Sequence, residues 1–255
     1  MENKPLILVT NDDGIGSKGI KSLVEVAKQF GEVLVVAPDS PQSGMGHAIT
    51  INHPLRLNES DVHEEVRSYS CSGTPVDCVK LAIYEVLKRK PDFLISGINH
   101  GSNCATNVLY SGTMSAAIEG ALEGIPSVGF SLLDFEKDAD FDGSKETAKK
   151  VLSKVIEKGM PKGMCLNVNI PKLNASEIKG IKICRQAKAS WEDKFDARKD
   201  QFGKDYYWLT GEFINHDKGE DSDIYALNNG YVSVVPTQFD LTAHHAITQL
   251  NDWEL

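Results

Sequence analysis

Two adjacent carboxylates, Asp12 and Asp13, follow a short apolar run and precede Gly14. Neighbouring negative charges repel each other, and a cation held by oxygen ligands keeps both of them ionised. Ser43 and Asn99 carry hydroxyl and amide oxygens that are candidates to complete such a site. Two carboxylates neutralise a divalent ion, so the site would suit an anionic substrate. The same Asp-Asp-Gly run is also an ordinary turn signal, and the residues alone leave both interpretations open.

A second group of polar residues lies at a predicted helix start, residues 110–115. Free backbone N–H groups at a helix N-terminus favour an anion, and the hydroxyls of Ser111 and Thr113 add donors. A phosphate would fit there. The alternative is an ordinary N-cap, which every helix start needs.

His47 follows the Ser-Gly-x-Gly loop of residues 43–46 and is a candidate proton donor to a leaving group, because imidazole titrates near neutral pH. His100, His244 and His245 are the other candidates, with surface or structural roles as the alternative.

Residues 14–19 have the G-x-G-x-x-G spacing of a dinucleotide fingerprint, and Asp39 follows at about the expected distance. The two carboxylates before Gly14 argue against this interpretation, since they would face a pyrophosphate with two negative charges. An NAD-binding oxidoreductase therefore stays open only as an alternative.

The elements that position these residues alternate between short β-branched runs and helical patterns, which predicts βαβ units. We expect an α/β fold with a Rossmann-like, doubly wound, mostly parallel sheet over residues 1–180. Thr74, Pro75 and Asp77 predict the start of one of its helices. The polar loops that follow the strands would then meet at one edge of the sheet, where ligands bind in such folds. Predicted strands occupy residues 6–9, 33–37, 93–96, 127–131 and 166–170.

The pattern changes after residue 180. Residues 181–238 are rich in aromatic side chains and predict an extended β arm, and residues 239–255 predict a terminal helix. An exposed arm with this much aromatic area would be covered by a second copy of the chain. We therefore expect the arm and the helix to serve oligomerisation.

The overall composition limits the partners. The 255 residues carry a formal charge of −9, and no long Lys or Arg run would hold a nucleic-acid polymer. The N-terminus lacks the pattern of a signal peptide or a membrane span, so no membrane partner is expected. Five scattered cysteines without a C-x-x-C pair suggest neither disulfides nor zinc. A cytoplasmic location is expected.

Together these motifs resemble the SurE family of 5′/3′-nucleotidases, the stationary-phase survival proteins. In the first half of the chain the resemblance rests on Asn11-Asp12-Asp13-Gly14, Ala37-Pro38-Asp39, Ser43-Gly44, Ser96-Gly97-Ile98-Asn99, Tyr110-Ser111-Gly112-Thr113, Ala116-Ala117 and Glu119-Gly120. It continues in Tyr207-Trp208, Gly211-Glu212, Asp221-Ser222-Asp223, Gly230-Tyr231-Val232-Ser233-Val234 and Asp240-Leu241-Thr242-Ala243, and so covers nearly the whole chain.

The resemblance implies a metal-dependent phosphomonoesterase that hydrolyses nucleoside 5′-monophosphates, with 3′-monophosphates and short polyphosphate as further candidates. It implies one divalent cation per subunit, Mg²⁺, Mn²⁺ or Co²⁺, and a homodimer or homotetramer built by exchange of C-terminal segments. The implied ligands of the cation are Asp12, Asp13, Ser43 and Asn99.

Combined with the charge argument, the resemblance assigns catalytic roles to the two carboxylates, and the place of His47 after its glycine-flanked loop makes it the candidate catalytic proton donor. The implied phosphate contacts are Gly44, Asn103, Ser111, Gly112 and Thr113. Water is the favoured nucleophile, and attack by a carboxylate stays open. Gln42 and His100 are candidates to tune substrate choice. A nucleotide-binding regulator without turnover remains a second alternative.

Overall fold

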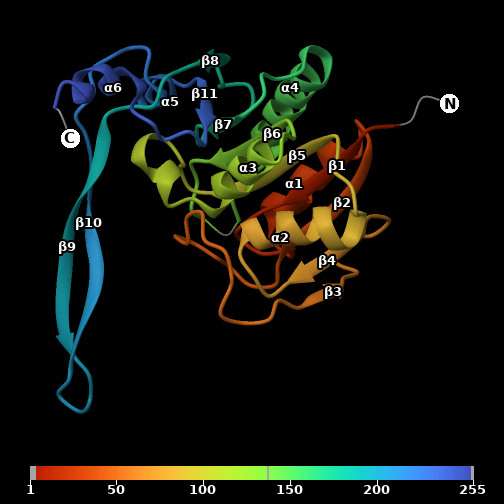
Figure 1. Cartoon of the computed structure of the whole chain (residues 1–255), viewed down its shortest axis with the longest axis horizontal. Coiled ribbons are helices and arrows are strands. Elements are labelled where there is room, and N and C mark those ends of the chain that lie inside the picture. The colour runs from red at the N-terminus through yellow and green to blue at the C-terminus, as the bar shows by residue number, and fades with distance from the viewer. Residues whose placement is uncertain (1–3, 137, 254–255) are drawn as a thin grey trace.

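The computed structural model describes residues 4–136 and 138–253, and a nine-stranded sheet forms its centre (Figure 1). The strand order is β3-β4-β2-β1-β5-β6-β7-β11-β8, and all neighbours are parallel except β3 with β4 and β7 with β11. The predicted mostly parallel α/β sheet is thus confirmed. Its strands are β1 (Leu6–Thr10), β2 (Glu32–Pro38), β3 (Leu57–Glu59), β4 (Arg67–Cys71), β5 (Phe93–His100), β6 (Ser127–Leu132), β7 (Met164–Ile170), β8 (Ile181–Ile183) and β11 (Val232–Gln238).

Six α-helices accompany the strands within the described residues: α1 (Lys18–Ala27), α2 (Pro75–Leu81), α3 (Gly112–Leu122), α4 (Asp142–Lys158), α5 (Asp223–Asn228) and α6 (His244–Asn251). A π-helical turn, Ala82–Leu87, continues α2, and a 3₁₀ turn, Ala105–Leu109, precedes α3. The predicted start of α2 is confirmed: Thr74 caps it, Pro75 occupies the first turn, and the Asp77 side chain accepts from the Thr74 backbone N–H. In the part of the chain that the structure describes, no helix is long and apolar enough to cross a bilayer.

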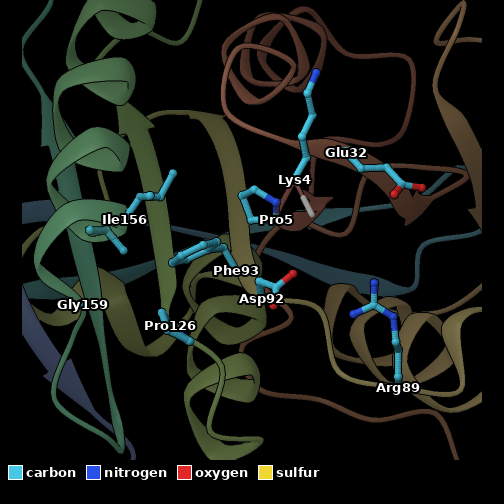
Figure 2. Close-up of a pocket in the computed structure, with 10 residues that line it drawn as sticks. Lys4, Pro5, Glu32, Arg89, Asp92, Phe93, Pro126, Ile156 and Gly159 are labelled. Carbon is cyan, nitrogen blue, oxygen red and sulfur yellow. The ribbon is translucent and has the colours of Figure 1, made fainter. Parts of the chain in front are cut away.

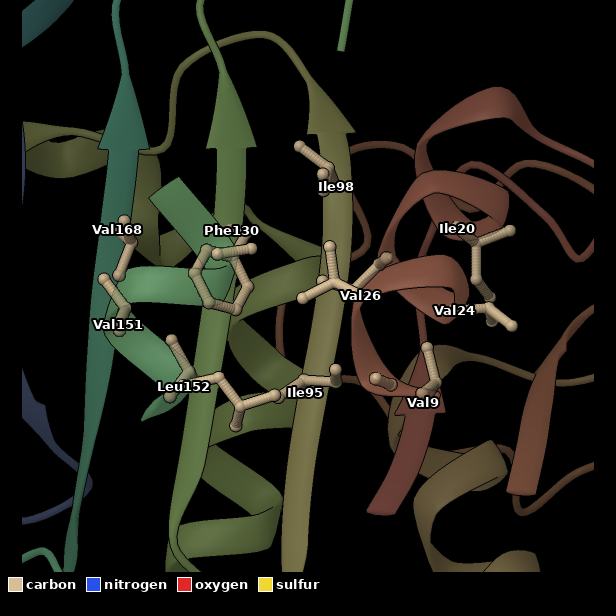
Figure 3. Close-up of a cluster of buried hydrophobic side chains, with 14 of the residues drawn as sticks. Val9, Ile20, Val24, Val26, Ile95, Ile98, Phe130, Val151, Leu152 and Val168 are labelled. Atoms are coloured by element: carbon tan, nitrogen blue, oxygen red, sulfur yellow. The ribbon is translucent and has the colours of Figure 1, made fainter. Parts of the chain in front are cut away.

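The central strands are buried on both faces, so their residues alternate between two cores. On β1, Ile7 and Val9 pack into one core with side chains from α1 and α4. Figure 3 shows Val9 in this core. Leu6 and Leu8 pack into the other core, which contains side chains from α2 and α3. The continuous apolar runs in the sequence reflect this double burial.

The chain runs outward in opposite directions from the centre of the sheet. From β1 it proceeds to β2 and β4 on one side, whereas β5 is followed by β6 and β7 on the other. The order therefore reverses between β1 and β5, and ligands of open α/β sheets bind at such a switch point. Asp12, in the loop after β1, and Asn99, near the end of β5, flank this position.

The C-terminal third differs from the predicted arm. Residues 181–238 do not form one extended segment, because β8 and β11 join the main sheet and α5 lies between the hairpin and β11. Only β9 (Ala189–Lys199) and β10 (Asp205–Asn215) form a separate two-stranded hairpin, which projects from the body (Figure 1). The predicted terminal helix corresponds to α6. Long-range pairing of β11 with β7, which local sequence does not reveal, accounts for the difference.

Candidate functional site

A pocket with a volume of about 850 Å³ lies at the switch point. It is bounded by the loops after β1, β2 and β5, the start of α3, the loop after β6 and the base of the β9–β10 hairpin. No Lys or Arg is among the described residues that line it, whereas Asp12 and Asp193 are. The lining residues are Asp12, Ser43, Gly44, Asn99, His100, Ser102, Asn103, Asn107, Tyr110, Ser111, Phe135, Trp191, Asp193, Leu209, Thr210 and Gly211.

The Asp12 carboxylate is the most deeply placed charge of this pocket, with only 5% of the residue exposed. Its Oδ1 accepts a hydrogen bond from Thr113 Oγ1 at 2.5 Å, and Gly112 packs against the side chain so closely that a Cβ there would lie 2.7 Å from Asp12 Cβ. Burial raises the pKa of Asp12 to about 6, the Thr113 hydroxyl works against that rise, and the Asp13 charge adds to it. A cation in the pocket would remove this penalty.

Asp13 and Asn99 are held by backbone groups at the end of β5 and in the loop that follows it. Asp13 Oδ2 accepts from the His100 backbone N–H at 3.1 Å, and burial raises the pKa of this carboxyl as well. Asn99 Nδ2 donates to the Gly101 carbonyl at 3.0 Å, which leaves the Asn99 Oδ1 as a free acceptor in its described surroundings. Oxygen ligands of this kind suit Mg²⁺ or Mn²⁺. The donor set therefore fits a divalent cation.

Ser43 and Gly44 sit on a loop that is tied down on both sides. The Gln42 N–H donates to the Asp12 carbonyl at 2.8 Å, and the Gly46 N–H donates to the Tyr110 carbonyl at 3.1 Å. The loop therefore bridges the end of β1 and the start of α3. Ser43 and Gly44 lie between these two ties and line the pocket. Across residues 4–136 and 138–253, no group of three or more His, Cys, Asp or Glu could hold a metal, so any cation here would depend on neutral oxygens too.

Besides Gly44, two of the four other predicted phosphate contacts line the pocket. Ser111 is the N-cap of α3, since its Oγ accepts from the Met114 N–H at 3.0 Å, and its own hydroxyl proton remains for a ligand. Asn103 is nearly buried and donates from Nδ2 to Ser131 Oγ at 2.8 Å, which leaves its second amide proton. Gly112 and Thr113 are not lining residues, and the Thr113 hydroxyl is engaged with Asp12.

His47 is not among the lining residues of the pocket. Its Nε2 lies 2.8 Å from Glu119 Oε2, and Lys80 Nζ lies 2.5 Å from the other oxygen of the same carboxylate. Glu119 belongs to α3, and its side chain is 2% exposed. The structure thus brings His47 to a buried carboxylate, and its role as a proton donor stays a prediction.

Several lining residues were not predicted from the sequence. Trp191, Asp193 and Gly211 come from the base of the hairpin, and Phe135 comes from the loop after β6. Because β6 is parallel to β5, its loop ends at the same sheet edge, and this topological argument would have pointed to Phe135. Nothing local in the sequence indicates that the hairpin base returns to this edge.

A second pocket, of about 840 Å³, lies at the opposite edge of the sheet (Figure 2). It is lined by residues that precede or begin β1, β2 and β5, including Lys4, Glu32 and Asp92. Figure 2 shows the charged ends of Lys4, Glu32 and Arg89 pointing in different directions. Among the described residues that line it, charged groups do not converge, and the pocket at the switch point is the better candidate.

Comparisons with known proteins find relatives along nearly the whole chain. Residues 7–193 match the family model described as "Survival protein SurE". The chain is 65% identical over 254 residues to 5′-nucleotidase SurE of Flavobacterium psychrophilum, covering 99% of both chains, and 62% identical to the protein of the same name from Flavobacterium johnsoniae, covering 100% and 98%. The crystal structure of a SurE protein from Aquifex aeolicus has a TM-score of 0.85 and 40% identity, with 98% of this chain and 100% of that chain covered.

Proposed function

The chain belongs to the SurE family, and from that premise we propose that it is a 5′-nucleotidase that needs a divalent cation to release phosphate from nucleoside 5′-monophosphates. The observation that carries this proposal is the charge of the switch-point pocket. Its described lining holds a buried carboxylate and no Lys or Arg. A phosphate dianion would be repelled from such a pocket unless a cation neutralised it.

We assign the cation to the oxygens of Asp12, Asp13, Ser43 and Asn99. When bound, a divalent cation would supply the positive charge that draws in the phosphoryl group and polarises it. Thr113 holds one oxygen of Asp12, which orients the carboxylate. The Asn99 amide group is oriented by the Gly101 carbonyl.

The remaining phosphate oxygens would be bound by the Gly44 N–H, the second amide proton of Asn103 and the Ser111 hydroxyl. These groups are held in place before substrate arrives, and preorganised donors are effective at stabilising charge that develops in a transition state. Asp13, the more exposed of the two carboxylates, is proposed to take the proton of the attacking water. His47 is proposed as the donor to the leaving oxygen, which requires that it leave Glu119 during turnover.

Phosphate release is the experiment that tests this proposal. The protein is stripped with a chelator and assayed on a panel of nucleoside 5′-monophosphates, 3′-monophosphates and short polyphosphate, before and after addition of Mg²⁺, Mn²⁺ or Co²⁺. Activity that appears only after the cation is restored supports the proposal. Full activity in excess chelator would refute the cation dependence. Nucleotide binding without any phosphate release would favour the regulator, and saturable NADH binding would favour the oxidoreductase.

Oligomerisation through the C-terminal elements and a cytoplasmic location belong to the same proposal. The five cysteines, Cys71, Cys78, Cys104, Cys165 and Cys184, are buried and unpaired in the described structure. Unpaired buried thiols are typical of proteins kept in a reducing compartment.

A further inference from the structure

Phe135 presents its phenyl ring to water at the mouth of the switch-point pocket. The residue is 81% exposed, among the most exposed large apolar residues described, and it lines the same pocket as Asp12. An exposed phenyl ring costs solvation free energy that burial would recover. A ring kept at the mouth of a pocket is therefore a candidate to contact a ligand.

The loop that carries this ring is tied down on both sides of it. The Glu136 N–H donates to Asp134 Oδ1 at 3.1 Å, so the backbone turns at Phe135. Lys172 Nζ then bridges the two flanking acidic side chains, at 3.0 Å from Asp134 Oδ1 and 2.9 Å from Glu136 Oε1. The Leu133 N–H donates to a β7 carbonyl at 2.9 Å just before the turn. These contacts fix the position from which the ring projects.

The ring lies against the loop that follows β5, two residues after the proposed cation ligand Asn99. A Cβ at Gly101 would fall 2.3 Å from Phe135 Cε1, and the Gly101 φ of +100° also disfavours a side chain. The Gly101 carbonyl accepts from Asn99 Nδ2. The phenyl ring thus lies next to the residue that orients a proposed cation ligand, and so close to the site assigned to the phosphate.

A second aromatic side chain lines the pocket from the hairpin. Trp191 Nε1 donates to Asn107 Oδ1 at 2.8 Å, and its ring centroid is 5.5 Å from that of Phe213. The described lining thus combines the oxygen groups assigned to the cation with two aromatic rings. A phosphate attached to a flat ring system matches both parts.

We propose that Phe135 is a specificity-determining residue that stacks against the nucleobase of the substrate. This inference rests on the proposed function and deepens it, because it separates nucleotides from other phosphomonoesters. Stacking uses the π face that every base possesses, so all four common bases should benefit, the larger purines most. Alanine substitution of base-stacking aromatics typically weakens binding by about 5-fold to 150-fold.

The first test compares substrates with and without a base. For Phe135→Ala we expect kcat/KM for AMP and GMP to fall by about ten-fold or more, mainly through KM. For ribose 5-phosphate, which lacks a base, kcat/KM should change by less than about two-fold. Phe135→Trp should restore nucleotide activity, whereas Phe135→Leu, which is apolar but has no π face, should not. Tyr84→Ala removes an exposed ring outside this pocket and should alter neither substrate.

Equal losses on AMP and ribose 5-phosphate, or no loss on either, would overturn the inference. A second measurement tests stacking through binding alone and does not require phosphate release. It follows the fluorescence of 2-aminopurine riboside 5′-monophosphate, which stacking should quench when the nucleotide binds in the presence of Mg²⁺. We expect the quench in the wild type and in Phe135→Trp and its loss in Phe135→Ala. An unchanged quench in Phe135→Ala would count against stacking, whereas a wild type that releases no phosphate from any nucleotide would count against the proposed function alone.

Discussion

Asp12 is the buried carboxylate of the site, and burial makes its charged form unfavourable. Burial raises its pKa to about 6, with the Thr113 hydroxyl opposing and the Asp13 charge adding to the rise. In the unfolded chain an Asp titrates near about 3.9. The folded state therefore binds the proton more tightly, so without a cation this group lowers stability progressively as the pH rises from about 4 through about 6.

We predict that Asp12→Asn is at least as stable as the wild type at pH 7 in the presence of chelator. Its free energy of unfolding should equal that of the wild type or exceed it by about 1–3 kcal/mol. The reason is that the buried charge is gone, while the amide oxygen can still accept the hydrogen bond from Thr113. The gain should vanish near pH 4. Urea titrations between pH 4 and pH 7 measure it, with the exposed Asp39→Asn as the control. The same variant should lose more than about 100-fold in phosphate release. A variant clearly less stable than the wild type at pH 7 would contradict the argument.

Glu119 shows the opposite balance. Burial raises the pKa of this carboxyl, but the hydrogen bonds from His47 and Lys80 together outweigh burial, and the pKa is lowered. A carboxyl with a lowered folded pKa stabilises the protein above its unfolded value of about 4.3 and loses that contribution as the pH falls further. Glu119 therefore joins the loop of His47 to α2 and α3 under neutral conditions.

We expect Glu119→Gln to lower the free energy of unfolding by about 1–3 kcal/mol at pH 7, since it leaves the ammonium of Lys80 without its buried partner. The deficit relative to wild type should shrink below about pH 4.3. Chemical unfolding as a function of pH measures both effects. Glu157→Gln removes an exposed carboxylate that pairs with Lys154 and should leave the free energy of unfolding nearly unchanged, because water screens such a pair. A deficit for Glu119→Gln that did not depend on pH would disprove the electrostatic explanation.

At the scale of elements, the glycines of residues 14–19 reflect geometry rather than a dinucleotide. Gly14 has a φ of +94° in the turn after β1. Gly19 brings α1 so close to β5 that a Cβ there would lie 1.9 Å from the Ile98 carbonyl oxygen. A strand, a tight turn and a closely packed helix need these glycines whatever the ligand, which explains why the spacing imitates the dinucleotide fingerprint.

Gly19→Ala should therefore destabilise the protein by about 2–4 kcal/mol, because α1 must move away from β5 and open the core between them. Gly16→Ala is the matched control three residues earlier, since nothing lies within 4 Å of its Cβ position. It should be neutral or slightly stabilising. Thermal or urea unfolding compares the two variants, and similar stabilities would show that the close approach is not required.

The sequence predicted those elements whose structure depends on residues nearby in the chain, and it did not predict those that depend on distant partners. Buried strands such as β1 and the capped start of α2 depend on near neighbours, and both were predicted. The insertion of β11 between β7 and β8 depends on partners more than 40 residues away, and it was not predicted. The same holds for the pocket: Asp12 and Asn99 carry their chemistry in their residue types, whereas the proposed role of Phe135 follows only from the sheet edge at which its loop lies.

At the scale of the whole molecule, the β9–β10 hairpin is long, but few of its side chains pack against the rest of the protomer. Each strand has eleven residues, and most of their side chains are exposed, including Phe195 and Leu209, which face each other across the hairpin. An isolated two-stranded hairpin is at best marginally stable in water. Figure 1 shows no other described element beside its outer half. A second copy of the chain would cover this apolar surface.

We predict that the wild type has at least twice the protomer mass in light scattering at micromolar concentration. Replacing residues 195–209 with Asn-Gly joins Lys194 to Thr210, which are cross-strand partners, and so keeps Trp191 and Asp193 in the shortened hairpin. This variant should have the mass of a monomer, because the surface that a partner would cover is gone while the main sheet is intact. Ile51→Ser, which removes an exposed apolar side chain elsewhere, should leave the wild-type mass unchanged. A monomeric wild type would exclude the hairpin as an oligomerisation element, and an unchanged mass in the shortened variant would move the interface to another surface.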